Sequence, residues 1–571
     1  MALIARAKLA LVLSLGVCAA LPAAAQERGL SGSYLAARHA SNYSDYSTAA
    51  EYYTRALARD PSNASLLENA MLAYMGLGQI SSAVPMARKL AGDGAESQIA
   101  QMVLMADALS KEDYQTVIDS LSEGDKVGPL VDGLVKAWSE LALGDMDSAI
   151  ASFDETTTST GLKPLGLYHK ALAYASVGNY EAADAIFSGA AEGPLRLTLR
   201  GVLAHAQILS QLGRGPDAIE LINSTFGPSQ EPTAMALLAR LEAGETLPFT
   251  LVRNGKDGTA EVFYSVARAL NGEASDNYTL LYSRVAEHLR PETHTDAILL
   301  SGNLLETMER YDLATQTYAR VERDDPSYPT AELGRAESLR AQGKFEASIE
   351  VLEQLTETHS DLSIVFVTLG DTLRREERYA EATAAYDRGV ALFDEDRANQ
   401  WVVYFARGIT HEREDQWPQA EADFRKALEL RPDQPRVLNY LGYSFIDKNE
   451  NLDEAMDMIE RAVAARPDDG FIVDSLGWGL FRLGRYEEAV APMEKASALM
   501  AVDAVVNDHL GDVYWAVGRH LEAQFQWRRA LSFDPDEKDA ERIRRKLEIG
   551  LDAVLEEEGE APLTLANDGG Q

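Results

Sequence analysis

The chain of 571 residues contains a single cysteine, Cys18, and its nine histidines are scattered. One cysteine cannot form an internal disulfide, and no H-x-x-x-H pair is present, so a structural metal site is not expected. The sequence also lacks a G-x-x-x-x-G-K-[ST] loop and a G-x-S-x-G elbow. Asp and Glu are too abundant for any one pair to indicate acid–base catalysis. We therefore expect no metal, no cofactor and no enzymatic activity.

Positive charge is also scarce, because 53 Lys and Arg residues face 90 Asp and Glu residues, giving a formal charge of −37. Such a chain repels nucleic acids and anionic lipid surfaces, so neither is an expected partner. The acidity either solvates helix faces or attracts basic partners, and its spread along the whole chain favours the first interpretation. Only the end of the chain forms an acidic block, which predicts a disordered tail over 557–571.

Long apolar runs are missing except at the start, where Leu9–Leu21 contains no charge and follows Arg6 and Lys8. This run of 13 residues is shorter than the roughly 20 needed to span a bilayer. With the small residues 23–25 behind it, the run predicts a signal peptide over 1–25 and a periplasmic protein without an integral membrane segment. Acylation of Cys18 is the alternative, but Val17 stands where a small residue is usual.

The sequence does contain a period of about 34 residues in its C-terminal half. Glycine and alanine recur at the positions where two helices would cross, and proline recurs where the second helix would end. These recurring residues are Gly442, Gly477, Gly511, Ala455, Ala489, Ala523, Ala462, Ala496, Ala530, Pro432, Pro467 and Pro535.

Stretches such as Gly484-Arg485-Tyr486-Glu487-Glu488-Ala489 resemble the tetratricopeptide (TPR) repeat. The resemblance implies an all-α solenoid, a right-handed superhelix of antiparallel helix pairs without chemistry of its own. We expect a degenerate stack of six pairs over 26–228 and an irregular helical junction, or a small inserted domain, over 229–294. Seven repeats over 295–537 and a capping helix over 538–556 follow.

The first helices of the last three repeats carry the candidate binding site. The resemblance implies that four positions of each helix face a concave groove, where short polar groups can bond an extended peptide and aromatic rings can anchor it. Packing between repeats is the alternative role of the aromatic residues. The candidate peptide-binding residues are Asn439, Tyr443, Asp474, Trp478, Phe481, Asp508, Asp512 and Trp515.

The runs 439–443, 474–478 and 509–515 also resemble a group of Gram-negative envelope TPR proteins. That group includes adaptors that bring substrates to carboxy-terminal processing proteases. The resemblance implies a periplasmic scaffold whose partner is a protein, such as an envelope protease or a wall enzyme. The alternative is a bridging component of a polysaccharide or outer-membrane export assembly.

Overall fold

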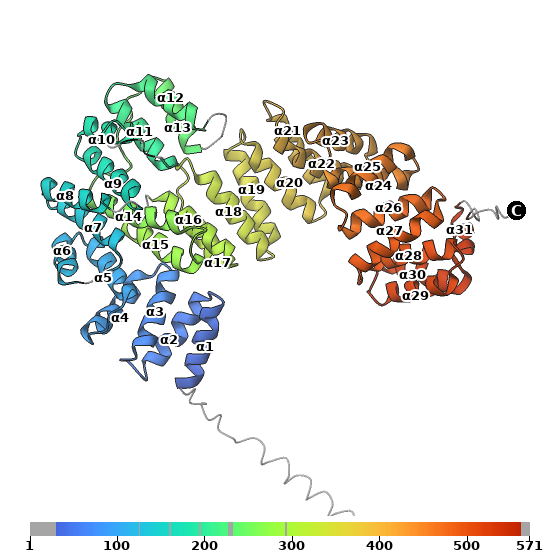
Figure 1. Cartoon of the computed structure of the whole chain (residues 1–571), viewed down its shortest axis with the longest axis horizontal. Helices are drawn as coiled ribbons and strands as arrows, with labels where there is room; N and C mark the ends of the chain where they lie inside the picture. The colour runs from blue at the N-terminus through green and yellow to red at the C-terminus, as the bar shows by residue number, and fades with distance from the viewer. Residues whose placement is uncertain are drawn as a thin grey trace, which may run out of the picture. The chain divides into compact units, whose positions relative to one another are not determined.

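The computed structural model describes residues 30–124, 126–158, 161–191, 193, 195, 197–226, 232–291, 294–560 and 563. In these residues the chain is helical without a strand, so the all-α prediction is confirmed (Figure 1). The predicted signal peptide, with Cys18, lies outside the described residues, as does most of the predicted acidic tail.

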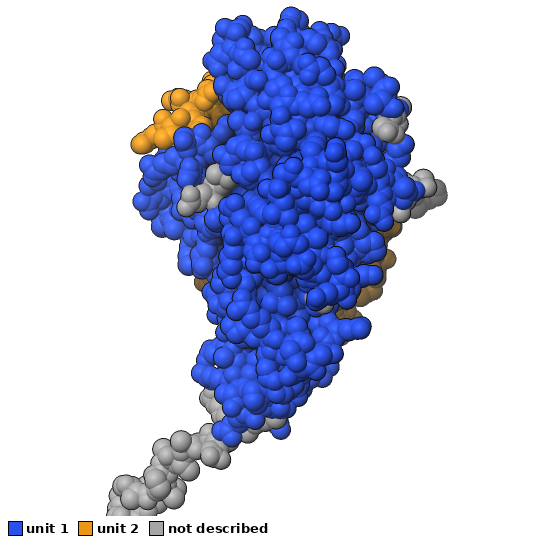
Figure 2. All heavy atoms as spheres, turned by 90° about the vertical axis from the view of Figure 1, so that its left-hand side faces the viewer, with its two compact units in different colours: residues 1–355 blue, residues 356–571 orange. Residues whose placement is uncertain are grey.

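The chain divides into two compact units, residues 1–355 and 356–571, which Figure 2 shows in different colours. The division falls inside α19, whereas the sequence period predicts a junction over 229–294. Each unit has its own hydrophobic core.

Unit 1 begins with six antiparallel helix pairs and continues through helices that pair less regularly. Its helices are α1 (Leu30–Asn42), α2 (Tyr46–Leu57), α3 (Ala64–Gly76), α4 (Ile80–Gly92), α5 (Gln98–Ser110), α6 (Tyr114–Glu123), α7 (Pro129–Ala142), α8 (Met146–Thr157), α9 (Lys163–Ser176), α10 (Tyr180–Phe187), α11 (Leu199–Gln211), α12 (Gly215–Phe226), α13 (Pro232–Glu242), α14 (Gly255–Leu270), α15 (Asp276–Leu289), α16 (Thr295–Thr307), α17 (Tyr311–Tyr318), α18 (Tyr328–Ala341) and α19 (Phe345–Thr358).

Unit 2 is a regular series of helix pairs followed by two further helices, of which the second is short. Its helices are α20 (Ser363–Arg375), α21 (Tyr379–Ala391), the 3₁₀ turn η1 (Ala398–Gln400), α22 (Trp401–Arg413), α23 (Trp417–Leu430), α24 (Pro435–Lys448), α25 (Leu452–Ala465), α26 (Gly470–Arg482), α27 (Tyr486–Leu499), α28 (Ala504–Ala516), α29 (His520–Leu531), α30 (Glu537–Ile549) and α31 (Leu551–Glu558). The first helices begin at Ser363, Trp401, Pro435, Gly470 and Ala504, so successive starts lie 38, 34, 35 and 34 residues apart, close to the period seen in the sequence.

The turn inside a helix pair ends the first helix with a residue in the left-handed region. Gly484 and Gly518 take φ values of 73° and 79° there. Glu377 and Asp415 take the same conformation at φ 58°, although a Cβ atom makes it unfavourable. The conformation is therefore a requirement of the pair, and it is met even where glycine is absent.

Glycines at the eighth position of the first helices allow each pair to cross closely. A Cβ atom added to Gly511 would lie 2.5 Å from the Trp527 ring, and one added to Gly370 would lie 2.7 Å from the Tyr386 ring. A small residue on one helix thus accepts a large side chain from its partner, as the sequence period indicates.

The segment predicted as an irregular junction forms the centre of unit 1. Helices α14 and α15 are buried along most of their length and contact α3, α5, α7 and α16 (Figure 1). The polar string 254–258 contains the start of α14, which begins at Gly255. Asn254 caps the helix by accepting the N–H of Asp257 at 2.8 Å.

Two glycines of that string let α14 approach α7. A Cβ atom on Gly258 would lie 2.2 Å from the Trp138 ring, and one on Gly255 would lie 2.4 Å from the Ala142 methyl group. In sequence, glycines that serve close packing cannot be told from glycines that end helices.

Buried polar contacts join the early helices of unit 1 to α15. Arg284 donates to the Gly76 carbonyl at 3.3 Å, to Glu287 at 3.0 Å and to Thr317 at 3.1 Å. Ser44 donates to Asn277 at 2.9 Å. The contacts of Arg284 with Gly76 and of Ser44 with Asn277 connect segments more than 200 residues apart, so unit 1 closes on itself.

Unit 2 has an inner side lined by its first helices. Neighbouring first helices, such as α24 with α26 and α26 with α28, contact one another directly, and more extensively than the second helices do. The first helices of neighbouring pairs therefore lie closer together than the second helices, which places the first helices on the inner side of the curved stack. We call their solvent-facing side the first-helix face.

The end of unit 2 differs from the predicted single helix over 538–556. Gly550, at φ 87°, separates α30 from α31, and a Cβ atom there would meet the Trp515 ring at 2.5 Å. Glu557 and Glu558, predicted as part of the tail, lie at the end of α31, where they pair with Arg545 and Arg542. The chain thus turns back to cover Trp515.

Candidate functional site

The predicted binding residues lie on α24, α26 and α28, at equivalent positions of three successive first helices. Asn439, Asp474 and Asp508 share the fifth position, and Tyr443, Trp478 and Asp512 share the ninth. The structure therefore brings all eight to neighbouring parts of one unit. Several of these predicted binding residues also form hydrogen bonds, ion pairs or ring contacts with other residues of the chain.

Asp474 is 7% exposed and lies 3.0 Å from Nδ1 of His509 on the next first helix. Burial opposes protonation of His509, but Asp474 and the other nearby carboxylates outweigh it and raise the pKa of the imidazole. The Trp478 ring stacks on His509 at 4.0 Å and on Phe481 at 4.9 Å. Asp474 and Phe481 are therefore part of the packing between repeats, and Trp478 remains half-buried.

Asp508 and Asp512 belong to a buried ion cluster. Lys546 of α30, which has no exposed side-chain surface, lies 2.7 Å from a carboxylate oxygen of each. Asp512 also accepts the Trp527 indole N–H at 2.9 Å. Desolvation raises the pKa of Asp508, while Lys546 acts against this shift. These carboxylates stabilise the C-terminal cap, so their substitution affects the fold as well as any ligand.

Trp515 is half-buried beside the same cap. Its indole N–H donates to Asp552 of α31 at 2.7 Å, and its ring stacks on His520 at 4.2 Å. Both the polar and the apolar parts of this side chain thus have partners within the chain.

Asn439 and Tyr443 lie on α24, away from the cap, and both are half-buried. The Oδ1 atom of Asn439 is buried and has no hydrogen-bond partner among the described residues. Burial, with a smaller contribution from Asp474, raises the pKa of Tyr443 to about 12. A polar atom without a partner and a half-exposed phenol are groups that a ligand can satisfy.

The first-helix face also carries an apolar row outside the predicted set. The second residue of the first helix is large, apolar and exposed in four of the five repeats of unit 2. These residues, the apolar row, are Ile364 (53% exposed), Val402 (50%), Phe471 (61%) and Val505 (49%). Exposed Arg436 occupies the equivalent position of the remaining repeat. Aligning the five helices by their eighth-position glycine reveals this row from sequence alone.

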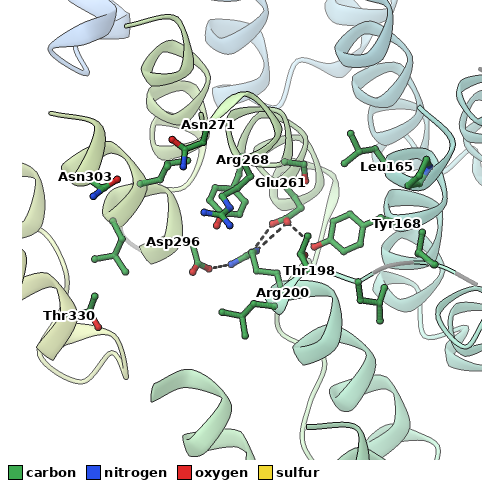
Figure 3. A pocket seen from close by; sticks show the side chains of 18 of the residues that line it. Leu165, Tyr168, Thr198, Arg200, Glu261, Arg268, Asn271, Asp296, Asn303 and Thr330 are labelled. Carbon is green, nitrogen blue, oxygen red and sulfur yellow. Dashed lines mark hydrogen bonds and ion pairs between the residues drawn. The ribbon is translucent and has the colours of Figure 1, made fainter. Parts of the chain in front are cut away.

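Unit 1 contains a second candidate site, a cavity of about 520 Å³ between α9, α11, α14 and α16 (Figure 3). Leucines form most of its apolar wall. They are Leu165, Leu195, Leu197, Leu199, Leu299 and Leu300. Sequence reasoning missed this cavity because its lining comes from helices far apart in the chain.

A buried polar network fixes the floor of this cavity. Arg200 lies between Glu261, at 2.7 Å, and Asp296, while the Tyr168 hydroxyl donates to Glu261 at 2.9 Å (Figure 3). The carboxylates keep Arg200 charged and raise its pKa, although burial acts in the opposite direction. Burial raises the pKa of Tyr168 well above its usual value. The floor is therefore rigid and its cation is already paired.

Neither surface brings together a recognisable metal site. Among the residues that the structure describes, no group of three or more His, Cys, Asp or Glu side chains is arranged to hold a metal ion. No described helix has both the length and the apolar character needed to cross a bilayer.

Residues 134–195, 299–362 and 405–470 match the family model of the tetratricopeptide repeat. TPR repeat-containing protein PA4667 of Pseudomonas aeruginosa is 26% identical to this chain over 189 residues. The match covers 33% of this chain and 31% of that protein, so the chain spans about a third of the length of its curated relative.

Solved structures show a similar helical architecture at low identity. The APC/C hetero-tetramer Cut9–Hcn1 structure contains a chain 15% identical to this one, with 91% of this chain and 96% of that chain covered and a TM-score of 0.37. A tetratricopeptide repeat protein from Parabacteroides merdae is 14% identical, with 51% and 98% covered and a TM-score of 0.34. At these scores the likeness carries no information about ligands.

Proposed function

The chain is a tetratricopeptide-repeat protein, and we propose that it acts in the periplasm as an adaptor that holds a partner polypeptide on the first-helix face of unit 2. Repeat solenoids present extended surfaces built from equivalent residues, which suit the binding of another chain. The N-terminal signal-like segment supports the location, and the resemblance to envelope adaptors supports the role.

The observation that carries the proposal is the apolar row. Exposed apolar residues scattered singly need no explanation, but here they recur at one position of successive repeats. Asn439, Tyr443 and Trp478 lie further along the same helices and add polar and aromatic contacts. A surface with this repeat suits a segment that is itself extended.

The spacing of the row predicts the sequence of such a segment. Packed helices lie about 8–10 Å apart, and an extended chain advances about 3.3 Å per residue. One apolar residue in every three would therefore meet successive members of the row. Arg436 interrupts the row, so an acidic residue is expected at the matching point of the partner.

The test is affinity capture from envelope extract with the full chain, followed by mass spectrometry. Phe471→Ser and Val505→Ser together should abolish capture of the partner, because truncating central apolar contacts typically costs about 2 kcal/mol or more of binding. The matched control is Leu521→Ser with Phe525→Ser, which removes exposed apolar side chains from α29, a second helix.

The outcomes separate the possibilities. An envelope protease or wall enzyme that is lost only with the first pair of substitutions supports the adaptor role. Equal capture by both variants would rule out the first-helix face as the binding surface. Subunits of a polysaccharide or outer-membrane export assembly would favour the bridging role instead. N-terminal sequencing of the mature protein tests the location, and a lipid-modified Cys18 would contradict cleavage after Ala25.

A further inference from the structure

The cavity of unit 1 is a second binding site, and we propose that it takes a small amphiphile with an apolar body and a single anionic head group. This inference is independent of partner binding by unit 2. Three features carry it: the size of the cavity, the composition of its walls and the placement of its charges.

The size and the walls determine the apolar part of the ligand. A volume of about 520 Å³ lies within the roughly 300–1,000 Å³ of small-molecule sites. The leucines come from both sides of the cavity, with Leu165 on α9 and Leu299 on α16. Both are half-buried, so they retain surface that an apolar ligand would cover.

The wall is held rigidly enough to define a site. Tyr318 lines the cavity and is 4% exposed. A Cβ atom on Gly302 or Gly334 would lie 2.4 Å or 2.6 Å from its ring, and its hydroxyl donates to Glu306 at 2.8 Å. Together with the paired Arg200 floor, this arrangement limits collapse of the cavity.

The charges determine the head group. Arg200 is already shared by Glu261 and Asp296, so it is not available to a ligand. Arg268, on the same face of α14 as Glu261 and Tyr264, is exposed and has no ion pair with a described carboxylate. It is thus the one lining cation of the described residues that can receive an anion. Asn271 and Asn303, which also line the cavity, offer amide donors.

The probes are saturated carboxylates, used with the full chain below their micelle concentrations. Isothermal titration calorimetry should detect dodecanoate bound with one-to-one stoichiometry. Affinity should rise about fourfold for each methylene added from octanoate to dodecanoate, as expected when each methylene is buried. Dodecanol and dodecylammonium test the head group, and both should bind at least tenfold more weakly than dodecanoate, because a charge-assisted bond is lost.

Three variants locate the site. Arg268→Gln should reduce dodecanoate affinity about tenfold and leave dodecanol unchanged, since only the head-group contact is removed. Arg59→Gln is the matched control, an equal change of charge at another exposed arginine of unit 1, and it should have no effect. Leu299→Trp should fill the cavity and abolish binding of both ligands, and circular dichroism with thermal melting would verify its fold.

Four results would overturn the proposal. Dodecylammonium binding as tightly as dodecanoate would exclude an anion site. Equal losses of dodecanoate affinity in Arg268→Gln and Arg59→Gln would show that the net charge of the protein, and not a contact with Arg268, causes the effect. Undiminished binding by a folded Leu299→Trp variant would place the ligand elsewhere. Absence of dodecanoate binding by the parent chain would remove the site altogether, without consequence for partner binding by unit 2.

Discussion

The two units use the same helix pair but are stabilised in different ways. In unit 2 a helix contacts mainly the helices next to it in sequence, as expected of an open stack. In unit 1 the early helices α3, α5 and α7 also contact α14 and α15, which follow much later in the chain. The same local building block therefore gives a modular unit in one half and a closed, cooperative unit in the other.

The difference comes from a few residues and not from the repeat itself. Gly255 and Gly258 let α14 fit against α7, and Arg284 joins α15 to α3 and α17. Unit 2 has no counterpart of this inner helix pair among its described residues. Closure is thus an addition to a solenoid, and it can be removed by changing the residues that make it.

The largest effect should come from cutting the chain at two different points. A fragment starting at 356 contains all of unit 2 and should be a folded monomer. A fragment starting at 295 should aggregate, because α16 loses α15 and exposes side chains such as Ile298 and Leu304. Size-exclusion chromatography and circular dichroism test both, and monomeric behaviour of the longer fragment would contradict the closure of unit 1.

Removing one buried cation from each unit should lower the free energy of unfolding by similar amounts. The region of the chain that loosens should differ between the two units. Arg284→Met leaves Glu287 with Arg320 as its ionic partner, and Lys546→Met leaves Asp508 without one among the described residues. Breaking a buried ion pair costs up to about 3–5 kcal/mol. The Arg284 change should loosen helices throughout unit 1, whereas the Lys546 change should release only α30 and α31. Hydrogen exchange measured by mass spectrometry resolves the two patterns.

Arg545→Met is the control for the second change, because that arginine also lies on α30 but its side chain is 44% exposed. It should leave exchange in α28 and α29 unchanged. If the increase in hydrogen exchange in the Arg284→Met variant were confined to α15, unit 1 would be as modular as unit 2.

A clash at a close crossing should cost about 1–3 kcal/mol in either unit. Gly258→Val meets Trp138 in unit 1, and Gly511→Val meets Trp527 in unit 2. Trp138 is the one tryptophan of unit 1, so its fluorescence reports urea unfolding of the isolated fragment 30–355. The urea midpoint should fall for Gly258→Val in that fragment, and for Gly511→Val in the fragment 356–571, whose own tryptophans report its unfolding. Gly32→Val, where an added Cβ atom has open space, is the control.

The units should respond to pH in opposite directions. Burial lowers the pKa of His169 in unit 1 to about 3, so its stabilising contribution is present above about pH 6.5 and is lost as the pH falls toward the folded value. The pKa of His509 in unit 2 is raised, so its contribution is present below about pH 6.5 and is lost as the pH rises through the folded value.

Thermal melting of the fragments 30–355 and 356–571 at pH 5.5 and pH 8 measures these trends. His169→Gln and His509→Gln should each reduce the pH dependence of the fragment that contains them. An unchanged pH profile in either variant would show that other groups dominate that unit.

The smallest expected effect concerns the turns. Glu377→Gly should stabilise unit 2 by about 1 kcal/mol, because glycine removes the penalty of a Cβ atom in the left-handed region. Glu376→Gly, at the neighbouring position with φ −88°, should not stabilise it. Urea denaturation of the fragment 356–571 tests both changes.

The sequence predicts local features well because a helix pair is a local structure. The approximate starts of the first helices and the glycine crossings follow from the period of about 34 residues. The closure of unit 1 could not be read in this way, since the glycines near 255 resemble a break until α7 is placed beside them.

The candidate site shows the same limit. The period places Asn439, Asp474 and Asp508 at one helical position, but it does not show that Lys546 neutralises Asp508. Lys546 looks like one charge among many in a charged helix. Its burial depends on how α30 packs, which a pattern of residue types does not specify. Whether these side chains bind a peptide stays a prediction.

The late position of α14 and α15 in the chain also sets the order of events during synthesis. Ribosomes add about 5–20 residues per second, so about 10–40 s pass between the synthesis of α3 and the synthesis of α15, which packs against it. Throughout that interval the nascent chain exposes apolar surface that a chaperone can hold. Unit 2 can instead complete one helix pair after another as it emerges. The half of the molecule that is made first is therefore the half that takes longer to complete.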